Sequence, residues 1–247
     1  MIASQESLKS SYSAQAETYS PLYQNVVETM AGGIKSEVDR LERPLIVGIN
    51  GVDGVGKTHF TQEVAFSLIS HGLPVSILHM DSFTNPFDVR HSGPTKADNY
   101  YNRTFDFNSV KNMLKLIRQG LLFNKDFVHP DPNDDSRPVK HSYDIRSKNC
   151  VLLVEGVYIF RPEMVEYFDY KIYLGMPLDS MLDRGAVRDV ERFGDASTSK
   201  YEDKYIPAQR MYITEANPAR AADYVIDFTD WKIPRIITPL ELEESGY

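Results

Sequence analysis

The sequence predicts an α/β protein in which helices flank a mainly parallel sheet in three layers. Two observations support this prediction. Short apolar runs end at Ile49, Met80 and Val154, and the first of them, Leu45–Ile49, is uninterrupted, as in strands that are buried on both faces. Segments with helical spacing of apolar residues lie between these runs, and such alternation is typical of a parallel sheet. In an open sheet of this kind, ligands bind at the carboxyl ends of the strands.

The first elements are predicted from the residues before position 81. Residues 1–20 are polar and Ser-rich and predict an arm without regular structure. Apolar residues at helical spacing predict an amphipathic helix from Pro21 to about Arg43. A strand over Leu45–Ile49, a glycine loop, a helix over Lys57–Ser70 and a second strand over Val75–Met80 then follow in order.

The later elements continue the alternation of strands and helices. The polar stretch from 124 to 149 contains three prolines and is predicted to be an excursion over the substrate side rather than a domain linker. The remaining predictions are strands over Val151–Val154, Tyr170–Leu174 and Tyr224–Phe228, and helices over Val110–Arg118 and Leu178–Arg192. The chain is therefore divided into an N-terminal arm and helix, 1–43, and a single domain, 44–247.

Composition limits the function classes. The chain has 247 residues, a formal net charge of −8 and 42% hydrophobic residues, and its pI is about 5.3. Partners with dense negative charge select an excess of Lys and Arg, so we expect neither nucleic-acid nor membrane binding. A single cysteine excludes an intramolecular disulfide, and no apolar run is long enough to span a bilayer. These features predict a cytoplasmic protein.

One motif predicts a nucleotide site. The residues Gly51, Val52, Asp53, Gly54, Val55, Gly56, Lys57 and Thr58 match the phosphate-loop pattern G-x-x-x-x-G-K-[ST] at every fixed position. A chance match is expected in roughly 1 of 100 chains of this length, and the flanking strand and helix make chance rarer still. In this P-loop NTPase arrangement, backbone N–H groups cradle the phosphates, Lys57 binds the β- and γ-phosphates, and the Thr58 hydroxyl binds Mg²⁺.

Two carboxylates follow predicted strands. They help to distinguish a kinase from other proteins with a phosphate loop, such as GTPases, motors and other ATPases. Asp81 could accept the proton of an attacking hydroxyl or hold Mg²⁺, although a helix N-cap or turn role is an equal alternative for this residue type. Glu155 comes after four apolar residues and before a glycine. A functional carboxylate is favoured there over a surface one.

Four further motifs follow the glycine loop in order: Met80-Asp81-Ser82-Phe83, Phe105-Asp106, Val154-Glu155-Gly156-Val157 and the segment from Arg188 to Gly194. With these motifs, the chain from Leu45 to Asp230 resembles the uridine kinases and their relatives, phosphoribulokinase and pantothenate kinase. The resemblance implies ATP and Mg²⁺ as cofactors, with Asp81 as general base, Glu155 as a metal ligand and Asp106 in contact with the sugar of the acceptor.

A basic stripe is predicted on the helix that follows. Arg184, Arg188 and Arg192 recur every four residues and therefore lie on one helix face. In the resembled family, arginines of this region belong to a helical lid over the phosphates, which here would span about 183–205. The residues around Arg188 match the family motif most closely, so Arg188 is assigned a catalytic role. Arg184 and Arg192 are expected to bind the nucleotide. The alternative is a solvated face, because acidic residues lie among the arginines.

The acceptor is the least specified part. A small molecule that carries a hydroxyl is expected, and the resemblance implies a nucleoside. Tyr101 and Arg103 lie in an aromatic and polar tract that would suit a substrate loop, although the same tract may pack on the core. The alternatives are pantothenate, a sugar phosphate or nicotinamide riboside. A nucleotide-dependent switch protein is the alternative of another class, and a homo-oligomer is compatible with the sequence.

Overall fold

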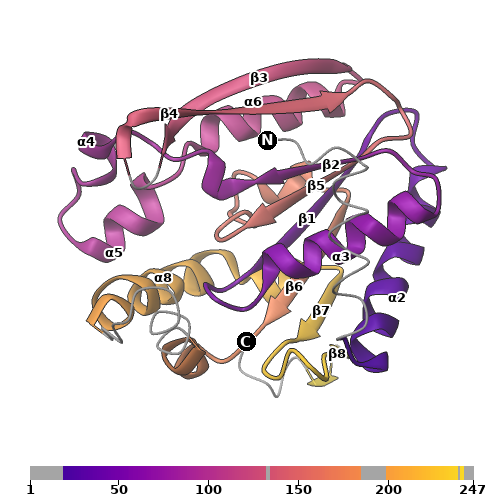
Figure 1. The fold of residues 1–247 in the computed structure, drawn as a ribbon. Helices are drawn as coiled ribbons and strands as arrows, with labels where there is room; N and C mark the ends of the chain where they lie inside the picture. Colours follow the sequence, from indigo (N-terminus) through magenta and orange to yellow (C-terminus); the bar gives the residue numbers. More distant parts are fainter. Residues whose placement is uncertain (1–18, 132–133, 185–198, 239, 242–247) are drawn as a thin grey trace.

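The computed structural model describes residues 19–131, 134–184, 199–238 and 240–241. Within this part of the chain, six strands form a central sheet in the order β2-β5-β1-β6-β7-β8 (Figure 1). Pairing is parallel throughout except at the edge, where β8 runs antiparallel to β7. The predicted mainly parallel α/β sheet is confirmed. Its strands are β1 (Leu45–Gly51), β2 (Val75–His79), β5 (Val151–Gly156), β6 (Tyr170–Gly175), β7 (Tyr224–Asp227) and β8 (Arg235–Ile237).

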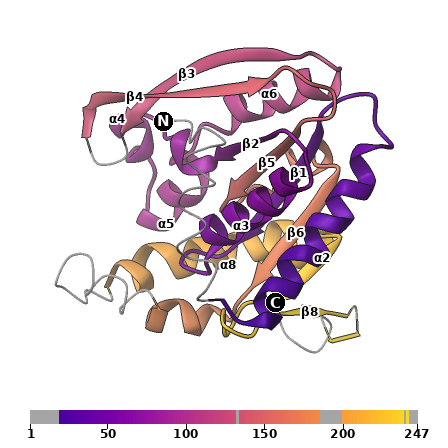
Figure 2. The ribbon, with the colours of Figure 1, turned by 45° about the vertical axis from the view of Figure 1, so that its right-hand side comes forward.

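Helices cover both faces of the sheet, which makes three layers (Figures 1 and 2). Helices α2 (Pro21–Val38) and α3 (Lys57–Ser70) bury their apolar faces in one core cluster with Val47, Ile49 and Leu153. Helices α6 (Phe107–Arg118) and α8 (Ile206–Ala216) contribute to the cluster on the other face. Neighbouring residues of one strand therefore face different cores, as the alternation of side chains along a strand requires.

The predicted N-terminal helix is shorter than expected. It begins at Pro21 after Ser20, whose hydroxyl accepts a hydrogen bond from Tyr23 N at 3.1 Å, and ends at Val38 instead of about Arg43. Gly33 lies within this helix where a Cβ would be 2.3 Å from the Tyr170 hydroxyl oxygen. Glycine at this position therefore permits close packing of the helix on the sheet and does not bend it.

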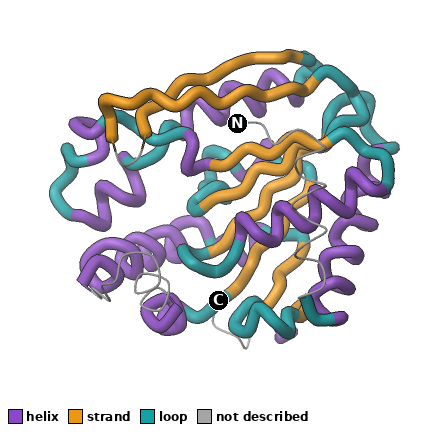
Figure 3. The backbone as a smooth tube through the Cα atoms, in the orientation of Figure 1, coloured by secondary structure: helices purple, strands orange, loops and turns teal. Residues whose placement is uncertain are grey.

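The excursion predicted over 124–149 has a regular structure that the sequence did not predict. Strands β3 (Phe123–Asp131) and β4 (Asp134–Ile145) form a long antiparallel hairpin that lies along α6 (Figures 1 and 3). Pro130 is paired with Pro138 near the turn, where the missing N–H groups interrupt only the distal end of the ladder. The Ser76 hydroxyl donates to Asp144 O at 2.8 Å and ties the hairpin to the sheet edge.

Short helical segments connect the longer elements. They are α4 (Phe87–Arg90), α5 (Lys96–Asp98), α9 (Pro218–Ala221), the 3-10 turns η2 (Met80–Ser82) and η4 (Val165–Tyr167), and the π-helical turns η3 (Asn99–Arg103) and η5 (Tyr201–Tyr205). Of the predicted lid, residues 183–184 and 199–205 belong to the described part, and 185–198 lie outside it. No described helix combines the length and the apolar character that crossing a bilayer requires.

Candidate active site

The loop from Gly51 to Thr58 has the backbone of an anion cradle. Gly54 and Gly56 have φ of 75° and 112°, a left-handed conformation that favours glycine. A Cβ on Gly51 would lie 2.7 Å from the Leu174 carbonyl oxygen, so only glycine fits there. Helix α3 begins directly after Gly56 without a side-chain cap. Its first N–H groups therefore remain available to phosphate oxygens, and the helix dipole favours negative charge there.

Two side chains at the start of α3 are the predicted phosphate and Mg²⁺ ligands. The Lys57 ammonium donates to Val52 O at 2.9 Å and so lies across the loop. The Thr58 hydroxyl donates to Glu155 Oε1 at 3.1 Å, although 97 residues separate the two in sequence. The structure thus places the predicted Mg²⁺ ligands Thr58 and Glu155 in contact. A hydroxyl beside a carboxylate at the end of a phosphate loop fits a hard cation with oxygen ligands.

Glu155 has a second partner that the sequence did not single out. In the parallel pairing of β2 with β5, His79 lies opposite Glu155, and its Nδ1 is 2.6 Å from Glu155 Oε1. Burial disfavours the charged carboxylate, but the hydrogen bond from His79 and the positive charge of Lys57 outweigh burial and lower the pKa of Glu155. Glu155 is therefore held as a carboxylate. The signal in the sequence was the position of His79 at the end of a strand, two residues before Asp81.

Asp81 lies in the turn η2, directly after β2, at the same edge of the sheet. Its side chain is exposed to water. Surrounding protein atoms nevertheless desolvate it, and together with the nearby charge of Glu155 they raise its pKa, which Lys57 and His79 partly oppose. Asp81 and Glu155 therefore differ in environment. The pKa of Asp81 is raised, whereas the pKa of Glu155 is lowered. Such a divergence is typical of acid–base sites.

Asp53, inside the loop, is bound by two distant elements. Its carboxylate accepts hydrogen bonds from the Tyr100 hydroxyl in η3 and from Gln209 Nε2 in α8, the latter at 2.8 Å. Behind the loop, the Tyr212 hydroxyl donates to the buried Asn50 Oδ1 at 3.0 Å. These contacts fix the loop against the opposite layer. The sequence indicated none of the partners, because no local pattern links them to the motif.

The predicted arginine stripe is described only at its first member. Arg184 donates to three backbone carbonyls: Val55 O at 3.3 Å, Phe228 O at 2.6 Å and Thr229 O at 2.7 Å. It therefore lies beside the phosphate loop but is engaged by the protein itself. Arg188 and Arg192 lie outside the described residues.

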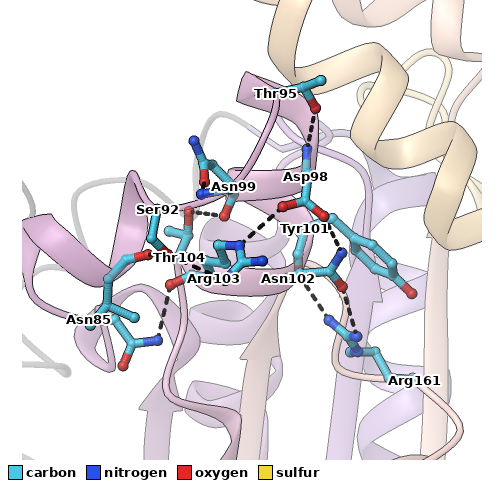
Figure 4. Close-up of polar contacts among 12 residues, drawn as sticks. Asn85, Ser92, Thr95, Asp98, Asn99, Tyr101, Asn102, Arg103, Thr104 and Arg161 are labelled. Atoms are coloured by element: carbon cyan, nitrogen blue, oxygen red, sulfur yellow. Dashed lines mark hydrogen bonds and ion pairs between the residues drawn. The ribbon is translucent and has the colours of Figure 1, made fainter.

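The predicted acceptor residues take different positions. Asp106 caps α6: its carboxylate accepts from Ser109 N at 3.0 Å and from Ser109 Oγ at 2.5 Å. Tyr101 is 1% exposed and donates its hydroxyl to Glu215 at 2.7 Å, which is the packing alternative for this residue. Arg103 donates from Nε to Asp98 at 3.0 Å (Figure 4).

A buried arginine fixes this acceptor-side turn. Arg161, in the loop after β5, donates to Tyr101 O at 2.8 Å and to Asn102 Oδ1 at 3.3 Å (Figure 4). Its guanidinium carbon also lies 4.3 Å from the centroid of the Tyr101 ring, in a cation–π contact. The turn is therefore held by a charged side chain from the loop that follows the strand of Glu155.

The hairpin closes the site from the other side. The centroid of the Phe83 ring, two residues after Asp81, lies 4.6 Å from that of His129 and 6.0 Å from that of Tyr143. Burial lowers the pKa of His129, while the charge of Asp106 opposes this shift, so His129 and Asp106 lie near each other. The residues from 124 to 149 thus contribute aromatic side chains beside the carboxylates.

Comparison with known proteins agrees with this geometry. The sequence profile of the phosphoribulokinase/uridine kinase family matches residues 46–228. The chain belongs to this family. Its members are P-loop kinases, and the matched range includes the glycine loop, Asp81 and Glu155.

Individual relatives are distant. A uridine kinase from Bacillus licheniformis is 24% identical over 202 residues, which cover 75% of this chain and 86% of that protein. The tRNA-specific adenosine deaminase subunit tad2 from Schizosaccharomyces pombe is 26% identical over 184 residues, which cover 73% of this chain. The match spans only 43% of the length of that second relative.

A solved structure shares the fold. The structure of a possible uridine kinase from Bacillus stearothermophilus superposes with a TM-score of 0.61 and 20% sequence identity. The superposition covers 79% of this chain and 96% of that chain. This likeness shows a P-loop kinase fold.

Proposed function

We propose that the chain is an ATP-dependent kinase that transfers the γ-phosphoryl group to a hydroxyl of a small molecule, with nucleosides as the first acceptors to test. The supporting observation is the convergence of Lys57, Thr58, Glu155 and Asp81 at the carboxyl ends of β1, β2 and β5. A switch protein needs the loop and its metal ligands but not a further carboxylate with a raised pKa.

Each residue has a separate task in the proposed reaction. Asp81 orients the acceptor hydroxyl and accepts its proton as the new O–P bond forms. Lys57 and the N–H groups at the start of α3 neutralise charge on the departing ADP oxygen as the old O–P bond breaks. Thr58 and Glu155, with Asp81 as a further ligand, are the residues that would hold Mg²⁺, whose charge supports the phosphates. Arg188 and Arg192 keep their proposed place at the nucleotide.

Nucleosides are favoured by the acceptor side. His129 is half-buried and lies among the rings of the hairpin, near Asp106. Both oxygens of Asp106 are bonded to Ser109, yet a carboxylate has about four acceptor positions, so it can also accept from a sugar hydroxyl. An aromatic surface beside a carboxylate suits a ring attached to a sugar. Pantothenate, sugar phosphates and nicotinamide riboside are the alternative acceptors.

The first test is a screen for ADP release over nucleosides, vitamins and sugar phosphates with ATP and Mg²⁺. The proposal expects at least one acceptor to raise ADP release well above background hydrolysis, with the phosphorylated acceptor found by mass spectrometry. If no acceptor does so while ATP still binds, the kinase proposal is contradicted.

Asp81→Asn then tests the general base. Loss of a general base reduces kcat by about 10²–10⁴-fold, whereas ATP affinity should stay within about twofold because the loop and Lys57 remain. Asp88→Asn is a matched control, since it removes the same charge from an exposed position in α4. Full transfer by Asp81→Asn would contradict the assignment of the base.

A further inference from the structure

A lysine that the sequence did not single out lies beside the phosphate loop. Lys204 is in η5, and its ammonium nitrogen lies 4.6 Å from the centroid of the Tyr100 ring and 4.9 Å from that of Tyr205. The side chain is half-buried, and this burial lowers the pKa of Lys204, although the charge of Asp53 opposes the shift. The ammonium group is thus close to both of these rings, which are nearly perpendicular to each other.

Tyr100 connects this lysine to the reacting groups. Its hydroxyl donates to Asp53, the third residue of the glycine loop. The negative charges of Asp53 and Asp81 both act on Tyr100, so the ring lies near both the loop and the proposed base. Lys204 contacts the face of this same ring. The ammonium is therefore on the side of the loop where the terminal phosphate of ATP and the acceptor hydroxyl must meet.

The donors of Lys204 have no acceptor among the side chains and carbonyls of the described part of the chain. An ammonium group carries three donors, and among the residues that the structure describes, none of them forms a hydrogen bond or an ion pair. The nearby Lys96 differs, because its ammonium is exposed and pairs with Asp203 at 3.2 Å. A partly desolvated ammonium without a partner costs free energy unless a ligand supplies one.

We propose that Lys204 binds the γ-phosphate of the nucleotide and stabilises it during transfer. The proposal rests on the proposed function, since it names a further residue of that site. Arg184, by contrast, donates to three backbone carbonyls. Tyr100 connects the lysine to the loop, because its hydroxyl donates to Asp53 and its ring contacts the Lys204 ammonium.

The alternative is that Lys204 only balances the charge of Asp53. The two roles differ in their dependence on the γ-phosphate. A residue that balances Asp53 shapes the loop for every nucleotide, whereas a γ-phosphate ligand distinguishes a triphosphate from ADP. The comparison of the two nucleotides requires no acceptor and no turnover, so its outcome is independent of whether the acceptor screen succeeds.

The test is isothermal titration calorimetry of the full chain with AMP-PNP and with ADP, each with Mg²⁺. Lys204→Gln should weaken AMP-PNP binding about tenfold, as expected for a lost charge-assisted hydrogen bond, and leave the Kd of ADP within about twofold. Lys204→Arg should restore part of the difference. Lys96→Gln, an equal change of charge at an exposed position, should change neither Kd.

Two results would overturn the proposal. Equal weakening of AMP-PNP and ADP would show that Lys204 shapes the loop, and unchanged binding of both would show that it does not contact the γ-phosphate. A rise in the acceptor KM alone would assign Lys204 to the acceptor and would also overturn it. If wild-type chain transfers no phosphoryl group but Lys204→Gln still loses the preference for AMP-PNP, only the kinase proposal fails.

Discussion

The phosphate side and the acceptor side of the site are built in different ways. On the phosphate side, the loop follows β1 directly, its glycines set the backbone, and Lys57 and Thr58 begin the next helix. On the acceptor side, Tyr101 is held by Glu215 and Arg161, and Phe83 packs on the hairpin, so each contact joins distant segments. The phosphate side thus depends on local backbone conformation, and the acceptor side depends on tertiary packing.

Lys57→Met is the strongest way to break the phosphate side. The change removes the cation that lies across the loop, so kcat should fall on the order of 10²–10³-fold, as for other preorganised charge-stabilising groups. ADP release under saturating acceptor measures the loss, and circular dichroism checks the fold. Lys115→Met, on the exposed face of α6, should retain wild-type kcat. A similar loss in both variants would contradict a specific role for Lys57.

On the acceptor side, Tyr101→Ala should affect stability before chemistry. Truncation of a buried aromatic residue lowers the free energy of unfolding by about 3–5 kcal/mol, whereas Tyr101→Phe loses only the hydrogen bond to Glu215, about 1 kcal/mol. Urea unfolding measures both changes. If Tyr101→Phe kept wild-type stability but raised the acceptor KM, Tyr101 would be an acceptor ligand after all.

His129→Ala tests whether the hairpin belongs to the acceptor site. Loss of one contact worth about 1 kcal/mol should raise the acceptor KM about fivefold to tenfold and leave the ATP KM unchanged. Steady-state kinetics with each substrate varied in turn separates the two constants. His91→Ala is the control, because that histidine is exposed and follows α4. A change in the ATP KM instead would place His129 on the phosphate side.

The smallest expected effect is on the pH profile. A base must be ionised, and the pKa of Asp81 is raised by desolvation from surrounding protein atoms and by neighbouring carboxylates, so kcat/KM should fall as pH decreases through a value above the ordinary range for aspartate. Asp53 is one of these carboxylates. Asp53→Asn should therefore move the acid limb to lower pH by a fraction of a unit. Movement to higher pH would contradict the assignment of Asp81 as the titrating base.

The same contrast explains what the sequence could predict. The bounds of α3 follow from the glycine loop before it and from Gly72 after it, whose φ is 84°. Strands β1, β2 and β5 follow from apolar runs whose ends carry polar residues. These patterns involve residues only a few positions apart, so the phosphate side can be predicted from the sequence alone.

The acceptor side could not be predicted from local sequence patterns. The hairpin strands are largely exposed and contain prolines, so they lack the apolar alternation by which a half-buried strand is found. The contact of Asp53 with Gln209 spans 156 positions, and no local pattern encodes it. The expectation that Tyr101 faces a substrate relied on residue type, which does not distinguish a buried tyrosine from an exposed one.

The position of β1 has a consequence for synthesis on the ribosome. In the described part of the chain, β1 pairs with β5 and β6, whose residues follow it by about a hundred positions. The glycine motif therefore emerges early, but the first of these two partner strands begins at residue 151. Pairing of such distant segments is slow to form and exposes apolar surface in the meantime. A nascent chain stopped before Val151 would carry the whole nucleotide motif without the strands that pair with β1.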